Sequence, residues 1–324
     1  MTLRSDFFDP DKPVMVIGGR GFVGSHTVRA LIAAGLKVHV FGPPMQVDLL
    51  ADLAGRFTES HGSVMDQQAM IDAIAQSRCD AVITNAAFAA GDQGMMRSGD
   101  QDAAKAMDIN VAGFRHTLEA ARVSGIRRVI WSDSTVVYGP QDIYGTERVD
   151  EGDARHPTTF YGLTKVLGED LGQYYRDRFD MDVVGLRMSL LLGGDLWYRG
   201  AASAITGVMA AAKPGHEHAV SFHNEHIDLM HVADIARSMV LALTHQHALA
   251  PHYNVNGFTA CMSEIIAAVT AAVPGYQVSH EIVESPLIFP LISDEAFRRT
   301  AGYAPTFDLK AVVKALTQGN NDDR

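Results

Sequence analysis

A short apolar segment that runs straight into spaced glycines constrains this chain more than any other feature. Residues 14–17 are Val-Met-Val-Ile, glycine follows at positions 18, 21 and 24, and residues 25–34 have helical spacing. This order predicts a strand, a tight turn and a helix. Glycine lets the turn approach a pyrophosphate closely, and the free N–H groups at the helix start face its phosphates. We therefore expect a dinucleotide-binding unit, the alternative being an ordinary strand-to-helix turn.

The end of the second strand bears on which dinucleotide binds. Residues 36–41 form that strand, and Gly42 occupies the position where NAD-binding units carry an acidic residue for the ribose hydroxyls. Without that carboxylate, Arg20 can meet a 2'-phosphate, so we expect NAD(P) as the cofactor, with NADP preferred. Alternatively, Arg20 is a solvated loop residue. The cofactor contacts expected in the turn are Gly18, Gly19, Arg20, Gly21, Phe22, Val23 and Gly24.

Strands and helices alternate through the first half of the chain. Residues 80–84 and 127–131 have the composition of buried strands, whereas residues 98–123 and 158–179 have helical spacing. This alternation predicts an α/β fold, a doubly wound parallel sheet of the Rossmann type. Ligands of such sheets bind beyond the carboxyl ends of the strands. Further cofactor contacts are expected there from Ser63, Val64, Asn85, Ala86 and Ala87.

Tyr161 and Lys165 make chemistry plausible. They are four residues apart in the helix expected over residues 158–179, so they share one face and are separated by about 6 Å along its axis. An adjacent ammonium favours the phenolate form of a tyrosine, which can then exchange a proton with a substrate hydroxyl. An ordinary surface tyrosine and lysine are the alternative.

Asn110 lies on the apolar stripe of the helix expected over residues 98–123. A polar side chain in that position must find hydrogen-bond partners. Either it makes a structural bond that holds a neighbouring strand, or it takes part in the chemistry.

These motifs together resemble the extended short-chain dehydrogenases/reductases. The matching segments are Gly18-x-x-Gly21-x-x-Gly24, Asn85-Ala86-Ala87, Asn110, Ser134 before Val136-Val137-Tyr138-Gly139, and Tyr161-x-x-x-Lys165. The resemblance implies that Ser134 hydrogen-bonds the reacting oxygen and that Tyr161 is the acid or base. It also implies that Lys165 holds the nicotinamide ribose and that Tyr161, too, contacts the cofactor. Asn110 is a further catalytic candidate. The hydride is the cofactor's contribution.

Positions at which this chain differs from the family's motifs indicate which branch of the family it resembles. Sugar dehydratases of this kind carry an Asp-Glu pair after the serine, where this chain has Thr135 and Val136. Nucleotide-sugar epimerases usually carry an arginine and an asparagine at the positions of Ile227 and Leu190. A buried diphosphate would lack partners here.

The segment from Tyr161 to Tyr175 is similar to short-chain L-threonine and uronate dehydrogenases. We therefore expect an NAD(P)-dependent oxidoreductase that acts on a small polar alcohol or carbonyl compound. A nucleotide-sugar epimerase with bound cofactor is the alternative, and a catalytically idle sensor or scaffold is the third.

Composition excludes several other classes. The net charge of −11 argues against nucleic acid or an anionic membrane as the main partner. Cys79 and Cys261 are too few for a disulfide framework or a metal knuckle, so a reducing cytoplasm is the expected compartment. The first 13 residues lack the apolar core of a secretion signal, and no apolar run is long enough for a membrane span.

Several histidines lie between residues 213 and 231. They can form a metal site, a substrate-facing polar loop or solvated surface. Their spacing is not that of a helical zinc motif, and no metal is expected. Arg199 could pair with a substrate carboxylate or lie along the surface. The candidate substrate contacts are Ser134, Thr135, Arg187 and Arg199.

We expect two lobes. Residues 1–187 and about 228–250 would form the dinucleotide-binding domain, and residues 188–227 and 251–324 a smaller C-terminal substrate-binding lobe. The family resemblance also implies a homodimer, with the helices that contain Asn110 and Tyr161 packed against their symmetry mates.

Overall fold

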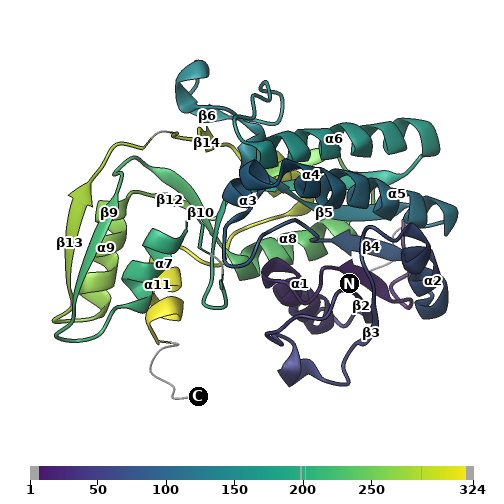
Figure 1. The fold of residues 1–324 in the computed structure, drawn as a ribbon, viewed down its shortest axis with the longest axis horizontal. Coiled ribbons are helices and arrows are strands. Elements are labelled where there is room, and N and C mark those ends of the chain that lie inside the picture. The colour runs from purple at the N-terminus through teal and green to yellow at the C-terminus, as the bar shows by residue number, and fades with distance from the viewer. Residues whose placement is uncertain (1–6, 198, 201, 286, 319–324) are drawn as a thin grey trace.

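Seven parallel strands form the centre of the molecule (Figure 1). The computed structural model describes residues 7–318 except 198, 201 and 286. The strand order is β11-β7-β5-β4-β1-β2-β3, and every neighbouring pair is parallel. The strands are β1 (Val14–Ile17), β2 (Val38–Gly42), β3 (Thr58–His61), β4 (Ala81–Thr84), β5 (Arg128–Ser134), β7 (Asp182–Met188) and β11 (His252–Val255). The predicted doubly wound α/β sheet is confirmed.

Helices cover both faces of this sheet (Figure 1). Successive residues of β1 point to opposite faces, and all of them are apolar. Val14 and Val16 pack with α1 (Phe22–Ala33) and α8 (Val232–Thr244), whereas Met15 and Ile17 pack on the other face. The helices on that second face are α2 (Gln67–Ser77), α5 (Gly113–Val123) and α6 (Phe160–Phe179). The two apolar layers fix which strand ends meet at the carboxyl edge of the sheet.

The single helix expected over residues 98–123 is wrong in detail. The chain forms α3 (Met95–Gln101), α4 (Ala103–Ala106), a π-helical segment (Met107–Ala112) and then α5. Asp102 interrupts the helix because its backbone is not helical (φ −137°, ψ 73°), and its carboxylate starts a new helix by accepting the N–H of Lys105. The π-helical segment contains Asn110, and such segments are frequent at functional sites.

A smaller lobe stands beside the sheet (Figure 1). It contains a three-stranded sheet in the order β12-β10-β8 and the pair β13-β9. Its elements are β8 (Leu190–Leu192), α7 (Ser203–Ala210), β9 (Glu217–Phe222), β10 (Ile227–His231), β12 (Phe258–Ala260), α9 (Met262–Ala272), β13 (Gln277–Ile282) and α11 (Leu309–Gln318). They enclose a hydrophobic core of their own.

The expected lobe boundaries need two corrections. Residues 227–231 form β10 in the lobe's sheet, whereas residues 252–255 form β11 at the edge of the central sheet. Helix α10 (Glu295–Ala301) also packs near β11, where Phe297 joins the core of the central sheet. Each lobe therefore takes a strand that the sequence division gives to the other. A short pair of β6 (Arg148–Val149) and β14 (Leu291–Ile292) completes the strands of the described chain.

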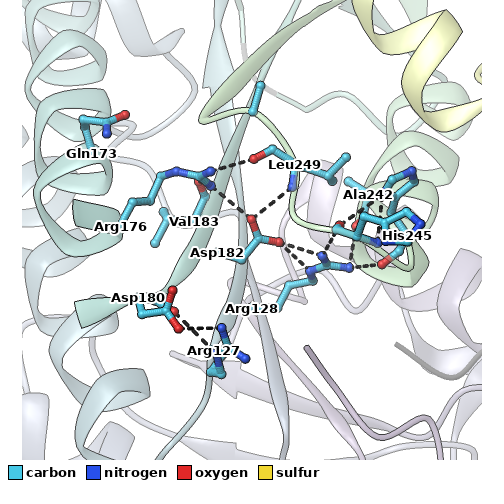
Figure 2. Close-up of polar contacts among 12 residues, drawn as sticks. Arg127, Arg128, Gln173, Arg176, Asp180, Asp182, Val183, Ala242, His245 and Leu249 are labelled. Atoms are coloured by element: carbon cyan, nitrogen blue, oxygen red, sulfur yellow. Dashed lines mark hydrogen bonds and ion pairs between the residues drawn. The ribbon is translucent and has the colours of Figure 1, made fainter. Parts of the chain in front are cut away.

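A cluster around Arg128 joins β5, β7 and the end of α8 (Figure 2). The Arg128 side chain is fully buried, and its Nε donates to Asp182 Oδ2 at 2.8 Å. Its other nitrogens donate to the backbone carbonyls of Ala242, Leu243, His245 and His247. The guanidinium therefore satisfies carbonyl groups that the end of a helix leaves without partners.

In the described part of the chain no helix has both the length and the apolar character that crossing a bilayer requires.

Candidate active site

The glycine turn after β1 is built for close backbone approach. Gly18 has φ +73°, a conformation that favours glycine, and a Cβ there would lie 3.1 Å from the backbone N of Ala86. A Cβ on Gly24 would lie only 2.0 Å from Gly18 O. Only glycine at position 24 therefore lets α1 pack this closely against the turn. Gly21 precedes α1 without a side-chain cap, which leaves the first N–H groups of the helix available to an anion.

A cavity of about 410 Å³ opens beside this turn. Of the predicted cofactor contacts, those that line it are Gly18, Arg20, Gly21, Phe22, Val23, Gly24, Ser63, Val64, Asn85, Ala86 and Ala87. Gly19, Tyr161 and Lys165, which were also predicted as cofactor contacts, are not among the residues that line it. A Cβ on Gly19 would meet the Val40 side chain at 3.0 Å, and the side chains of Tyr161 and Lys165 are buried on α6. The cradle, the free helix start and the small residues at the end of β4 fit a dinucleotide.

Sequence reasoning missed part of the cavity wall. Glu59, Ser60 and His61 line it from β3, Met95 from the start of α3, and Trp197 from a later loop. The residues of β3, Thr-Glu-Ser-His, lack the apolar alternation that marks a strand, so the sequence around them gives no clear strand signal. Asp66, which follows this segment, caps α2 by accepting the N–H of Ala69.

Arg20 reaches the cavity but is already paired. Its Nε and Nη2 donate to Glu59 Oε2 at 2.9 and 2.8 Å, and its Nη1 donates to Asp48 Oδ1 at 2.6 Å. Two carboxylates therefore face one guanidinium at this end of the cavity. The sequence could not show this pairing, since Asp48 and Glu59 lie in a loop and in a strand without a clear pattern.

Lys165 and Tyr161 lie on the inner face of α6. Both side chains are buried, and Lys165 Nζ is 5.4 Å from the centre of the Tyr161 ring. Nζ also donates to the backbone O of Ser132 at 2.5 Å, which ties α6 to β5. Burial lowers the pKa of Lys165 to about 8.

The serine segment after β5 packs against the start of α6. A Cβ on Gly162, next to Tyr161, would lie 2.4 Å from Val136 O, so the turn Thr135–Val137 and the first turn of α6 are in close contact. Ser134 is half-buried, and its Oγ accepts the N–H of Val136 at 3.4 Å. Thr135 Oγ1 donates to the backbone O of Met188 at 3.3 Å. The structure thus brings the segments of Ser134 and Tyr161 together.

The buried side chain of Asn110 makes structural hydrogen bonds, as its position on an apolar helix face requires. Its Oδ1 accepts the N–H of Phe88 at 2.8 Å, and its Nδ2 donates to Thr164 Oγ1 at 3.1 Å. Thr164 Oγ1 in turn donates to the backbone O of Tyr161. Asn110 therefore connects the loop after β4 to the helical turn that carries Tyr161.

Arg187 corrects one expectation. Its side chain is 1% exposed, its Nε and Nη2 donate to Glu169, and its Nη1 donates to the Tyr138 hydroxyl. A guanidinium buried in this way cannot reach a substrate, so its predicted substrate contact was wrong. Asp133, which the sequence did not single out, lies beside this pair, with Arg187 Nε 3.9 Å from its Oδ2.

Arg199 lies on an exposed loop. Its backbone pairs with residues 92–94, where its N–H donates to Asp92 O and its O accepts the N–H of Gly94. Its side chain is 85% exposed and lies 3.7 Å from Asp92 Oδ2. The same loop brings Trp197 to the cavity wall.

The histidine-rich segment 213–231 contributes one residue to a group with metal-ligand chemistry. Ligand atoms of His226, Cys261 and Glu264 lie within 4.8 Å of one another among the described residues. Glu264 accepts the N–H of Cys261 at 2.9 Å, as part of the cap of α9. Helix capping accounts for this contact.

Comparison with known proteins adds a family match. A model described as the NAD dependent epimerase/dehydratase family matches residues 14–256. A UDP-glucose 4-epimerase of Lacticaseibacillus casei is 30% identical over 176 residues, which cover 54% of this chain and 50% of the relative. A uronate dehydrogenase of Pseudomonas putida is 38% identical over 81 residues, 24% of this chain and 29% of the relative. The alignments thus span half or less of these relatives.

Solved structures share the fold over nearly the whole chain. The L-threonine dehydrogenase of Clostridium difficile superposes with a TM-score of 0.82 at 16% identity, covering 97% of this chain and 99% of that one. Identity at this level establishes the common fold and nothing finer.

Proposed function

This chain belongs to the NAD-dependent epimerase/dehydratase family, and we propose that it transfers a hydride between a nicotinamide dinucleotide and a small polar alcohol or carbonyl compound. Lys165 carries this proposal. It is a buried ammonium beside the Tyr161 ring, and the hydrogen bond that fixes it goes to a neutral backbone carbonyl. A buried charge without a structural acid partner is costly, so its retention here supports a role in the chemistry.

Tyr161 exchanges the proton in this scheme. The Lys165 charge favours the phenolate, which accepts a proton from a substrate hydroxyl during oxidation and returns it during reduction. Ser134, on the adjoining turn, hydrogen-bonds the same substrate oxygen. The cofactor supplies the site that accepts or donates the hydride.

The glycine turn and α1 would hold the cofactor's pyrophosphate. Backbone N–H groups at the start of α1 are the donors, and Asn85 to Ala87 form the floor beyond β4. The close backbone contact of Gly18 with Ala86 makes this cradle narrow and flat.

Apolar side chains at two positions favour a small substrate over a sugar nucleotide. Leu190 and Ile227, where epimerases of the family usually carry asparagine and arginine, lie on neighbouring strands and pack against the core of the lobe. Apolar side chains there offer no hydrogen bonds to a diphosphate. L-Threonine and uronates are the first substrates to try, by analogy with the dehydrogenases noted above.

A substrate panel with two readouts tests this function. Reduced cofactor would accumulate in step with oxidised product for L-threonine, a uronate or a related small alcohol, and the Tyr161→Phe variant would lose at least about 100-fold in kcat. Conversion of a UDP-sugar without net change in cofactor absorbance would instead establish the epimerase. Cofactor binding with no turnover, and full biological function in Tyr161→Phe, would favour the sensor or scaffold.

The choice between NAD and NADP depends on Arg20. The sequence predicts NADP, but Glu59 and Asp48 already surround this guanidinium, and a 2'-phosphate would have to displace or face them. A free 2'-hydroxyl could donate to Glu59 instead. We therefore propose that NAD binds more tightly than NADP, which replaces the NADP preference expected from the sequence.

Direct binding decides the cofactor question. Fluorescence titration of the wild type is expected to give tighter binding of NAD than of NADP. Glu59→Gln should improve NADP affinity by roughly tenfold, because it removes one repulsive charge and frees Arg20. Arg20→Ala provides the matched control: when it is combined with Glu59→Gln, the gain in NADP affinity should disappear.

We also propose a homodimer and a cytoplasmic location. Exposed apolar side chains on α5 and α6, namely Val123, Leu163, Tyr174 and Phe179, offer a surface for a second copy. Light scattering during gel filtration would measure the mass. Both cysteines are free and buried, as a reducing compartment permits.

A further inference from the structure

A buried carboxyl group, that of Asp133, has one oxygen to which no described residue donates a hydrogen bond. Asp133 is on β5 between Ser132, whose carbonyl holds Lys165 Nζ, and the catalytic candidate Ser134. Its Oδ1 accepts the N–H of Ser134 at 2.8 Å. Its Oδ2 is buried, and among the described residues no N–H or O–H group donates to it. Arg187 Nε, at 3.9 Å, is too distant for a hydrogen bond.

The group within hydrogen-bonding reach of Asp133 is another carboxyl group, that of Glu169. Glu169 already accepts three charge-assisted bonds, from Arg187 Nε at 2.6 Å, Arg187 Nη2 at 3.0 Å and Arg155 Nη1 at 2.8 Å. Burial alone would raise the pKa of Glu169, but the hydrogen bonds from Arg187 outweigh it and lower this pKa to about 2. Glu169 is therefore the ionised member of the pair.

Two carboxyl groups that face each other in a buried site need a proton between them. Burial, followed by the charge of Glu169, raises the pKa of Asp133 well above its ordinary value. A protonated Asp133 also removes the anomaly of the unpaired Oδ2, because its O–H becomes a donor to Glu169.

We infer that Asp133 is a protonated positioning residue, which donates to Glu169 and leaves Lys165 without a fixed counter-ion. Its hydrogen bonds hold the Ser132–Ser134 end of β5 against α6. Because Asp133 is neutral, the Lys165 ammonium stays directed toward Tyr161. The catalytic part of this inference rests on the proposed function, whereas the protonation itself does not.

The charged groups that face Asp133 come from two elements. Lys165 and Glu169 face it from α6, and Arg187 faces it from β7. Glu169 in turn faces Arg155 and His252, from the loop before α6 and from β11. Ionised Asp133 would form a direct pair with Lys165 and compete with Tyr161 for its charge. Activity is therefore expected to fall on the alkaline side as Asp133 loses its proton.

The Asp133→Asn variant separates the two protonation states by stability alone. Asparagine keeps an acceptor for Ser134 N–H and a donor for Glu169, but it cannot ionise. If folded Asp133 is protonated, unfolding releases its proton above about pH 4. The ratio of unfolding constants, wild type over D133N, should then rise by about tenfold for each pH unit between pH 5 and pH 7. A ratio that stays constant over this range would overturn the inference.

Activity provides the second readout. D133N should keep kcat within about threefold of the wild type at neutral pH and lose the alkaline fall that belongs to Asp133, whereas D133A should lose roughly tenfold. An ionised Asp133 predicts the reverse, a large loss of kcat in D133N with an acid-shifted optimum. If no substrate is turned over, the proposed function fails while the stability ratio still reports on the proton. If D133N does not fold, D133S, whose hydroxyl can also donate to Glu169, replaces it.

Asp182→Asn is the matched control. Asp182 lies at the other end of the same strand pair and accepts from Arg128 and Arg176, far from Lys165. D182N should lower stability without moving the alkaline side of the kcat profile. A shift there of the same size as in D133N would mean that any loss of a buried acid has this effect, which would overturn the positioning role.

Discussion

The pair of strands β5 and β7 carries a buried arginine–acid cluster at each end, and the two clusters differ in how completely they are satisfied. At the amino ends Arg128 is in register with Asp182, and at the carboxyl ends Asp133 is in register with Arg187. All four side chains are buried. Similar residues on the same two strands therefore serve as an internal comparison.

At the amino end every contact has a structural purpose. Arg128 bonds to Asp182 and to carbonyls at and beyond the end of α8, and Arg176 donates to Asp182 and to Leu249 O (Figure 2). At the carboxyl end, no described residue donates to Asp133 Oδ2, and the hydrogen bond that holds Lys165 goes to a backbone carbonyl. A fully satisfied cluster stabilises the fold, whereas an incompletely satisfied one marks the place where charge is kept for chemistry.

Removing Arg128 should give the largest loss of stability. Arg128→Met leaves Asp182 short of a partner and exposes unsatisfied carbonyls in the interior, so unfolding should become easier by about 3–5 kcal/mol. Urea denaturation measures this loss, and kcat per folded molecule should stay unchanged. Arg127→Met is the control, because Arg127 and its partner Asp180 are exposed and the pair contributes less than about 1 kcal/mol. Equal losses in both variants would show that burial does not distinguish the amino-end cluster.

Removing Lys165 should have the opposite effect, a loss of activity without a loss of stability. Lys165→Met is expected to lower kcat by about 100-fold, since the phenolate of Tyr161 loses its stabilising charge. Stability should hold or improve, because a buried ammonium is replaced by an apolar side chain of similar shape. Parallel measurement of kcat and of urea midpoints checks both parts. A large loss of stability with unchanged kcat would place Lys165 with the structural residues.

The features that the sequence predicted are those with a local cause. The apolar run of β1, the glycines at 18 and 24, and the helical face shared by Tyr161 and Lys165 depend on neighbours a few residues away. Their positions in the fold follow from alternation of strands and helices, which also predicts that Asn85 and Ser134 lie at the same edge of the sheet.

The features that the sequence missed depend on contacts between distant segments. Glu169 and Asp133 are on different elements, and nothing near either residue indicates that they share a proton. Arg187 and Arg20 looked available for a ligand because their acid partners come from elsewhere in the chain. The exchange of β10 and β11 between the lobes has the same origin, since strand pairing across lobes leaves no local signal.

Alkaline pH should separate stability from activity at the carboxyl end. The pKa of Lys165 is about 8 in the folded protein and 10.5 in an ordinary lysine, with burial as the cause of the difference. Between these values the unfolded chain binds a proton that the folded chain lacks, so this residue's contribution makes the protein more stable as pH rises. Activity that needs the ammonium falls over the same range. Urea unfolding of the wild type and Lys165→Met from pH 8 to pH 10 measures the effect, and identical pH dependence in both would contradict it.

Arg155 offers the smallest test, because it is the outer member of the carboxyl-end cluster. It donates to Glu169 at 2.8 Å and to the exposed Asp170 at 2.9 Å, and about a third of its side chain is exposed. Solvent screens such a pair, so Arg155→Met should cost only about 1 kcal/mol, well below the loss expected for Arg128→Met. Glu169 keeps both bonds from Arg187 and therefore stays ionised, which leaves the proton on Asp133. Urea denaturation at neutral pH gives the cost, and a loss as large as that of Arg128→Met would mean that the two ends of β5 and β7 are held by equally structural clusters.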